Sequence, residues 1–145
     1  MTAMKWFVRC AGAYNASAVI AFLTPGVLPA LGVPLPHSPF WVWLPALLGL
    51  FAGLTLLLAS TDLRRYGTLP YWNGIVRLVF VVAALTLSFG ESAGTFMGLL
   101  AWGDLPLALG AIFGMPLALG CSHLDLLLAR DLPVPGGATS GESPR

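Results

Sequence analysis

One long uncharged stretch limits what this chain can fold into. The 52 residues from Cys10 to Thr61 include no Asp, Glu, Lys or Arg. Such a stretch is atypical of a soluble domain, in which about 25% of residues are charged. It is also too long for a single membrane crossing, which needs about 20 residues. Two crossings joined by a proline-containing bend account for it, so the sequence predicts an integral membrane protein.

The composition of the whole chain agrees with this prediction. Hydrophobic residues make up 57% of the 145 residues and charged residues 9%, and the mean hydropathy is +0.85. A chain of this length has room for about four spans and short loops. The net charge is +1, and no basic cluster is longer than Arg64-Arg65. The sequence therefore indicates neither a nucleic-acid partner nor a polybasic lipid-binding segment.

The apolar segments predict an all-α fold, a four-helix bundle in the membrane. The bundle is expected to occupy residues 1–132, and the Pro-, Gly- and Ser-rich residues 133–145 are expected to be a disordered tail. Pro25 and Pro29 should kink or end the first span, because proline lacks an amide donor and clashes with the preceding turn. The predicted spans are residues 6–28, 40–60, 71–89 and 105–129.

The fourth span carries two further expectations. Asp104 is a suitable N-cap residue, since its carboxylate can accept from free amides of the first turn, and Pro106 also suits that turn. Residues 90–103 are apolar but too short for a crossing of their own. We expect them either to extend the third span or to lie along the membrane surface.

The positions of Lys and Arg predict the orientation. They flank the N-terminus, the second loop and the end of the fourth span, whereas the first and third connections have none. The positive-inside rule then places both termini and the second loop in the cytoplasm. The residues that decide this are Lys5, Arg9, Arg64, Arg65, Arg130 and Arg145.

Two pairs of glycines occur at the spacing of helix contacts. Gly49 and Gly53 are four residues apart in the second span, and Gly110 and Gly114 are four apart in the fourth. Small residues at this spacing let helix backbones approach closely in a membrane, where lipid gives no hydrophobic drive for association. We expect packing inside the bundle, with self-association between copies as the alternative.

Arg77 is a cation well inside the predicted third span. It shares a helix face with Asn73, Ala84 and Ser88, so it is expected to point into the bundle. A charge there is costly, about 2.5–3.5 kcal/mol at the membrane centre. Asp62 or Asp125, at the cytoplasmic ends of other spans, is the expected partner.

These residues define a predicted polar pocket that faces the cytoplasm and suits an anionic headgroup or a small anion. Asn15 is expected to bond a backbone carbonyl instead. In the alternative, the long arginine side chains reach the membrane surface and the carboxylates are only counter-ions. The pocket residues are Arg9, Asp62, Asn73, Arg77 and Asp125.

Residue patterns typical of enzymes are missing from the sequence. It has no His-Glu-x-x-His, phosphate-binding loop or Gly-x-Ser-x-Gly pattern. Cys10 and Cys121 form no Cys-x-x-Cys pair, and His37 and His123 are predicted on opposite sides of the membrane. We therefore expect no enzyme activity, no metal and no cofactor.

Four short features resemble the DoxX-like and BphX-like group of small bacterial four-helix membrane proteins. They are Arg9-x-x-Gly12, the proline-rich residues 29–39, Asp62-Leu-Arg64-Arg65 and Gly103-Asp104-Leu105. The resemblance covers the spans and implies a bacterial cytoplasmic membrane. Members of the group are mostly of unknown function, and some are linked to oxidoreductase systems.

The predicted function is a non-enzymatic accessory protein or a protein that binds lipid or a small anion. The alternatives are a small oligomeric transporter and an accessory subunit of a membrane oxidoreductase system. A transporter needs polar groups at mid-membrane, whereas the predicted polar groups lie at the cytoplasmic ends, which favours the first function. The expected partners are membrane lipids and a second copy or another membrane protein.

Overall fold

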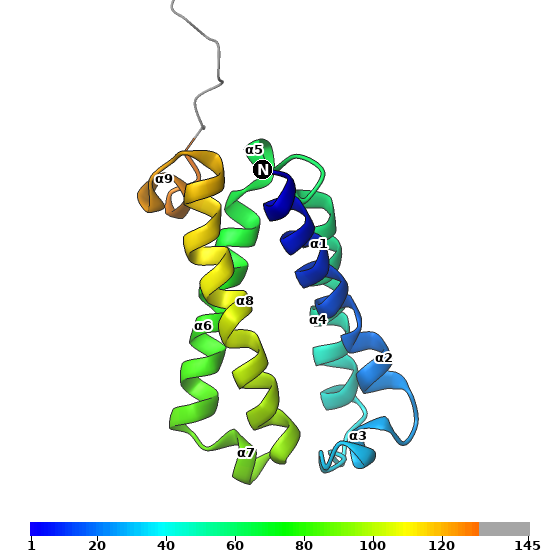
Figure 1. Ribbon diagram of the computed structural model, residues 1–145. Coiled ribbons are helices and arrows are strands. Elements are labelled where there is room, and N and C mark those ends of the chain that lie inside the picture. The colour runs from blue at the N-terminus through cyan, green and yellow to red at the C-terminus, as the bar shows by residue number, and fades with distance from the viewer. Residues whose placement is uncertain (131–145) are drawn as a thin grey trace, which may run out of the picture.

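A computed structural model describes residues 1–130. All regular structure in this range is helical, and Figure 1 shows long helices running side by side. This confirms the predicted all-α class with four apolar helices and indicates an integral membrane protein. The predicted tail, residues 133–145, lies outside the described range. The segments long and apolar enough to cross a membrane are Thr2–Leu23, Phe40–Ala59, Thr68–Thr86 and Thr95–Leu119.

The first segment is interrupted in its second half. It consists of α1 (Thr2–Ala16) and α2 (Ala18–Leu23), and Ser17 lies between them. The Ser17 hydroxyl donates to the carbonyl of Tyr14 at 2.6 Å, which competes with the regular helix bond. The Ser17 amide still donates to Ala13 and its carbonyl accepts from Ala21, so the backbone continues into α2 without unwinding.

The first segment also ends earlier than predicted. Thr24 is extended (φ −78°, ψ 121°), the conformation favoured directly before a proline. Helix α2 therefore ends at Leu23, and the prediction of residue 28 was wrong. A short helix, α3 (Val27–Ala30), follows at the end of the molecule opposite the N-terminus (Figure 1).

The second and third segments agree more closely with the sequence. Helix α4 (Phe40–Ala59) has almost the predicted limits. Helix α5 (Leu63–Tyr66) is a single turn, and α6 (Thr68–Thr86) begins and ends three residues before the prediction. The earlier start of α6 places Pro70 in its first turn, where a missing amide hydrogen costs nothing.

The fourth segment corrects the prediction most. Helix α8 (Thr95–Leu119) begins and ends ten residues before the predicted span, residues 105–129. It follows the short α7 (Phe89–Ser92), so most of residues 90–103 belong to the fourth segment and not to the third. Gly94 (φ 99°) and Gly120 (φ 67°) bound it in conformations that favour glycine. A last helix, α9 (His123–Leu127), lies beyond it.

The four segments form two tightly packed helix pairs. In the first pair α1 and α2 pack against α4, and in the second pair α6 packs against α8. Contacts between the pairs are fewer. The main apolar core lies where the N-terminus, α5 and α9 come together (Figure 1). Its buried residues are Val8, Ala11, Leu56, Leu63, Tyr71, Met115 and Leu126.

Glycines bring the backbones of the first pair together. A methyl group added at Gly53 would lie 2.6 Å from the amide nitrogen of Ala16, and one added at Gly49 would lie 2.5 Å from the Cβ of Ala18. Gly110 and Gly114 instead meet the side chains of Phe7 and Met4. The predicted glycine pairs thus lie at contacts inside the bundle.

Candidate functional site

An arginine lies in the middle of the bundle. Arg77 is the tenth of the 19 residues of α6, about 14 Å from the helix start at about 1.5 Å per residue. It is buried, with 6% of its surface exposed. Burial at this depth requires hydrogen bonds and a counter-charge, because lipid and apolar side chains supply neither.

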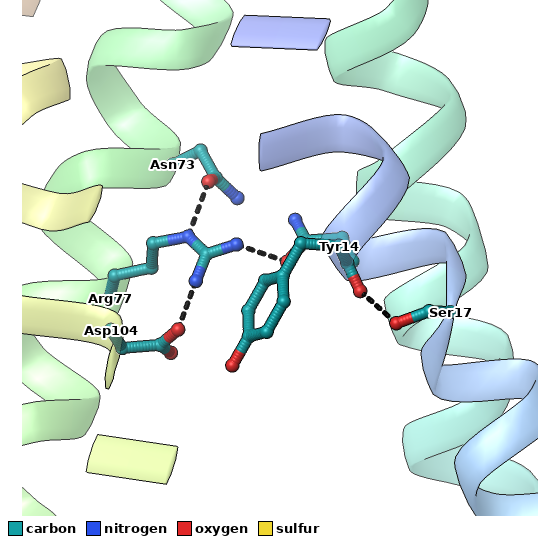
Figure 2. A network of polar contacts seen from close by, with 6 residues as sticks. Tyr14, Ser17, Asn73, Arg77 and Asp104 are labelled. Carbon is teal, nitrogen blue, oxygen red and sulfur yellow. Dashed lines mark hydrogen bonds and ion pairs between the residues drawn. The ribbon is translucent and has the colours of Figure 1, made fainter. Parts of the chain in front are cut away.

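Arg77 donates to three partners on three helical segments. Nε donates to Asn73 Oδ1, one turn earlier on α6, at 3.0 Å. One terminal nitrogen donates to Asp104 on α8 and forms an ion pair with it, and the other donates to Asn15 on α1 (Figure 2). The guanidinium thus connects the second helix pair to the first.

The counter-ion differs from the prediction. Asp104 is the tenth of the 25 residues of α8 and is buried, so it is not an N-cap. Neither Asp62 nor Asp125 contacts Arg77, because both lie at the end of the bundle near the N-terminus (Figure 1). The interior position of Arg77 agrees with the prediction, but the predicted partners were wrong.

The remaining members of the predicted pocket are dispersed. Arg9 Nε donates to Ser60 Oγ at 3.3 Å. Asp62 caps α5 by accepting from the amides of Arg64 and Arg65. Asp125 is in the capping box of α9 and lies 3.7 Å from Arg130. Only Asn73 and Arg77 of the five predicted residues meet.

Hydrogen bonds from Ser122 lower the pKa of the Asp125 carboxyl, and the nearby Arg130 lowers it further. Asp125 is therefore a structural cap at the surface. Its carboxylate fixes the start of α9 and is not available to a site in the membrane interior.

A cavity of about 180 Å³ adjoins the Arg77–Asp104 pair. It lies in the side of the bundle between the first helix pair and α8. Its polar end includes Tyr14, Asn15 and Asp104, and the Tyr14 ring lies 5.2 Å from the guanidinium carbon of Arg77 (Figure 2). The rest of the lining is mainly apolar and includes Ala18, Ala21, Phe22, Phe96 and Leu100.

The arrangement is electrically balanced. Arg77 and Asp104 compensate each other, and the hydrogen bonds to Asn73 and Asn15 occupy further arginine donors. Only Oδ1 of Asp104 bonds to Arg77, so Oδ2 can accept from the Tyr14 hydroxyl or from a ligand. The site is therefore better suited to a group that donates hydrogen bonds than to an anion.

Three members of the site, Tyr14, Asn15 and Asp104, were missed from sequence. The expectation that Asn15 bonds a backbone carbonyl was wrong, because its side-chain oxygen accepts from Arg77. The missed signal is the run from Thr95 to Leu119, in which Asp104 is the one charged residue. Two glycines bound that run, which matches the length of a span. One acid and one arginine within two neighbouring spans would then have suggested a pair.

In residues 1–130, no group of three or more His, Cys, Asp or Glu side chains is placed to hold a metal ion. Comparison with known proteins gives no match to a family model, a curated protein or a solved structure. The likeness to DoxX-like and BphX-like proteins stays a prediction from the short features of the sequence.

Proposed function

We propose that this chain is a non-enzymatic membrane protein that binds a small lipophilic ligand in the side cavity. The ligand's polar head lies against Asp104 and Tyr14, and its apolar part lies between α2 and α8. The observation that carries this proposal is that the cavity ends at a buried, charge-compensated ion pair. A cavity with apolar walls and a few converging polar groups is typical of small-molecule sites.

The chemistry of the polar end selects the ligand head. Arg77 is already neutralised, so an anion would place a second negative charge beside Asp104. A neutral or cationic head that donates a hydrogen bond to Asp104 avoids this repulsion. The cavity of about 180 Å³ is small, so the ligand must also be small.

The proposal includes a bacterial cytoplasmic membrane with both termini inside the cell. The support is the distribution of charge, because Lys5, Arg9, Arg64 and Arg65 belong to the end of the bundle that holds the N-terminus and α5 (Figure 1). Among residues 1–130, the opposite end has Glu91 and no Lys or Arg. This asymmetry is the one that the positive-inside rule relates to orientation.

Three six-carbon probes test the proposal: 1-hexanol, hexylamine and hexanoate. They share an apolar tail and differ in the head, which is neutral, cationic or anionic at pH 7. We expect the alcohol and the amine to raise the melting temperature of the detergent-purified protein, because a ligand that binds the folded state stabilises it. Hexanoate should have little effect.

Ala21→Phe provides the cavity variant, since it adds volume to the lining. It should abolish the stabilisation by hexanol and hexylamine. Val82→Phe, at a side chain 54% exposed on α6, is the control and should leave it unchanged. Equal stabilisation of both variants, or a preference for hexanoate, would contradict the proposal.

One observation favours transport as a second candidate. The site lies at mid-helix between two helix pairs, and the first segment is interrupted at Ser17, next to the site. Transporters place polar sites and interrupted helices at mid-membrane, so the reason for disfavouring transport from sequence no longer holds. Uptake of labelled hexylamine into proteoliposomes that is lost in Ala21→Phe would select this candidate over simple binding.

A further inference from the structure

A second depression, with lining residues different from those of the side cavity, lies nearer the end of the bundle that holds the N-terminus. It is a groove of about 360 Å³ between α1 and the end of α4. One part of its lining is polar or aromatic and another is apolar. The lining residues are Trp6, Arg9, Cys10, Ala13, Leu57, Ser60 and Thr61.

Two cations stand at this groove without a carboxylate partner among the described residues. Arg9 uses Nε in its bond to Ser60 Oγ, and its guanidinium carbon lies 5.2 Å from the Trp6 ring. Lys5 Nζ donates to the carbonyl of Thr61 at 3.2 Å. Arginine carries five N–H donors and lysine three, so most of their donors remain available. The nearby Asp62 is occupied as the cap of α5.

The groove also has the depth of a lipid headgroup. Ser60 and Thr61 directly follow the membrane-spanning α4, and the exposed Trp6 ring is of the kind enriched at membrane surfaces. Ala13 lies one turn deeper on α1 than Arg9, and Leu57 lies one turn deeper on α4 than Thr61. Cations at the surface therefore continue into an apolar surface toward the membrane interior.

We propose that this groove binds one anionic phospholipid. Arg9 and Lys5 hold the headgroup phosphate, and an acyl chain lies along Ala13 and Leu57. Charge-assisted hydrogen bonds from arginine to phosphate are among the stronger polar contacts in proteins. A free phosphate ion shares this head chemistry but would make no use of the apolar part, so the two sources are separable. The site is independent of the side cavity and of its ligand.

The test uses the full chain in nanodiscs of dioleoylphosphatidylcholine with increasing dioleoylphosphatidylglycerol. Native mass spectrometry counts the lipids that the released protein retains. We expect one retained phosphatidylglycerol in the wild type, and about tenfold weaker retention in Arg9→Gln, since a hydrogen bond to a charged group contributes about 1.5 kcal/mol or more. Arg64→Gln, on α5 at the same end of the bundle but outside the groove, is the matched control and should change retention less than twofold.

Ala13→Phe keeps both cations and fills the apolar part of the groove. It should weaken retention of phosphatidylglycerol about as much as Arg9→Gln does, and it covers the case in which Arg9→Gln fails to fold. Inorganic phosphate at millimolar concentration should not displace the lipid. Equal losses in Arg9→Gln and Arg64→Gln would indicate general surface attraction and overturn the proposal. Full retention in Ala13→Phe, or displacement by phosphate, would also overturn it.

Discussion

The first membrane segment has two sides that pack in opposite ways. Toward α4, glycines and alanines bring backbones into contact, and a methyl group added at Gly53 would lie 2.6 Å from a backbone nitrogen of α1. Toward α8 the same segment borders a cavity and contributes Asn15 to the network of Arg77 and Asp104. One contact depends on close fit, and the other depends on a few charged hydrogen bonds.

The difference between these two contacts follows from the lipid that surrounds the helices. Lipid gives helices no hydrophobic reason to associate, so a contact needs either close van der Waals packing or polar bonds. The first pair uses close packing where Gly49 and Gly53 of α4 meet the first segment. The contact between the pairs uses the ion pair, so it tolerates a hollow beside it, and that hollow is where we place the ligand. The two contacts should therefore respond differently to mutation.

Asp104→Asn should have the largest effect. It leaves the Arg77 charge buried without a counter-ion, and breaking a buried pair in this way costs about 3–5 kcal/mol. Asp62→Asn and Asp125→Asn, at exposed caps, should cost much less than Asp104→Asn, because water screens exposed charges. Equilibrium unfolding in mixed detergent micelles measures all three. Similar losses of unfolding free energy at the three positions would mean that the stability of the bundle depends no more on its middle than on its end.

Gly53→Ala should have an intermediate effect of about 1–3 kcal/mol, because the added methyl group meets backbone atoms that cannot move alone. Gly114→Ala is the matched control on α8. Its added methyl group would lie 3.2 Å from the sulfur of Met4, a flexible side chain that can shift. The free energies of unfolding of the two variants should differ. Equal values would remove the distinction between a backbone contact and a side-chain contact.

The smallest effect is expected at the surface, in the capping box of α9. Ser122→Ala should raise the pKa of Asp125 toward its ordinary value near 3.8, because it removes the hydroxyl that bonds the carboxylate. The folded pKa lies below the unfolded value in the wild type. The cap therefore contributes stability above the unfolded pKa and loses it as pH falls through the folded pKa. Carboxyl carbon chemical shifts across a pH titration measure the change.

An Asp125 pKa that does not move in Ser122→Ala would mean that another group holds the carboxylate. The structure offers two candidates: the backbone amide of residue 122, which donates to Oδ2 at 3.0 Å and remains in the variant, and Arg130, 3.7 Å away. Arg130→Gln tests the second.

Sequence patterns predicted the fold better than the site. Runs of apolar residues have the length of a membrane crossing, so the number of spans and the limits of α4 follow from them directly. The limits of α8 do not, because Pro106 and Asp104 look like a helix start although both lie inside the helix. The glycine conformations at Gly94 and Gly120, which set the limits, are a property of the folded backbone.

The error in the site followed from the error in α8. With the fourth span placed ten residues late, Asp104 lay at its edge, and the search for a partner of Arg77 turned to Asp62 and Asp125. Asn15 was missed for a different reason. Its bond to Arg77 joins residues 62 positions apart and depends on how the two helix pairs sit together, which periodicity along one helix does not report.

A double-mutant cycle between Arg77 and Asp104 tests the central claim most directly. The free energy of unfolding is measured in the same micelles for Arg77→Leu, Asp104→Leu and the double variant. The coupling energy is the change in the double variant minus the sum of the changes in the two single variants. We expect a coupling of about 2–3 kcal/mol for this pair, and no measurable coupling when Asp125→Leu replaces Asp104→Leu. A coupling near zero with Asp104, or a larger one with Asp125, would contradict a buried ion pair that joins the two halves of the bundle.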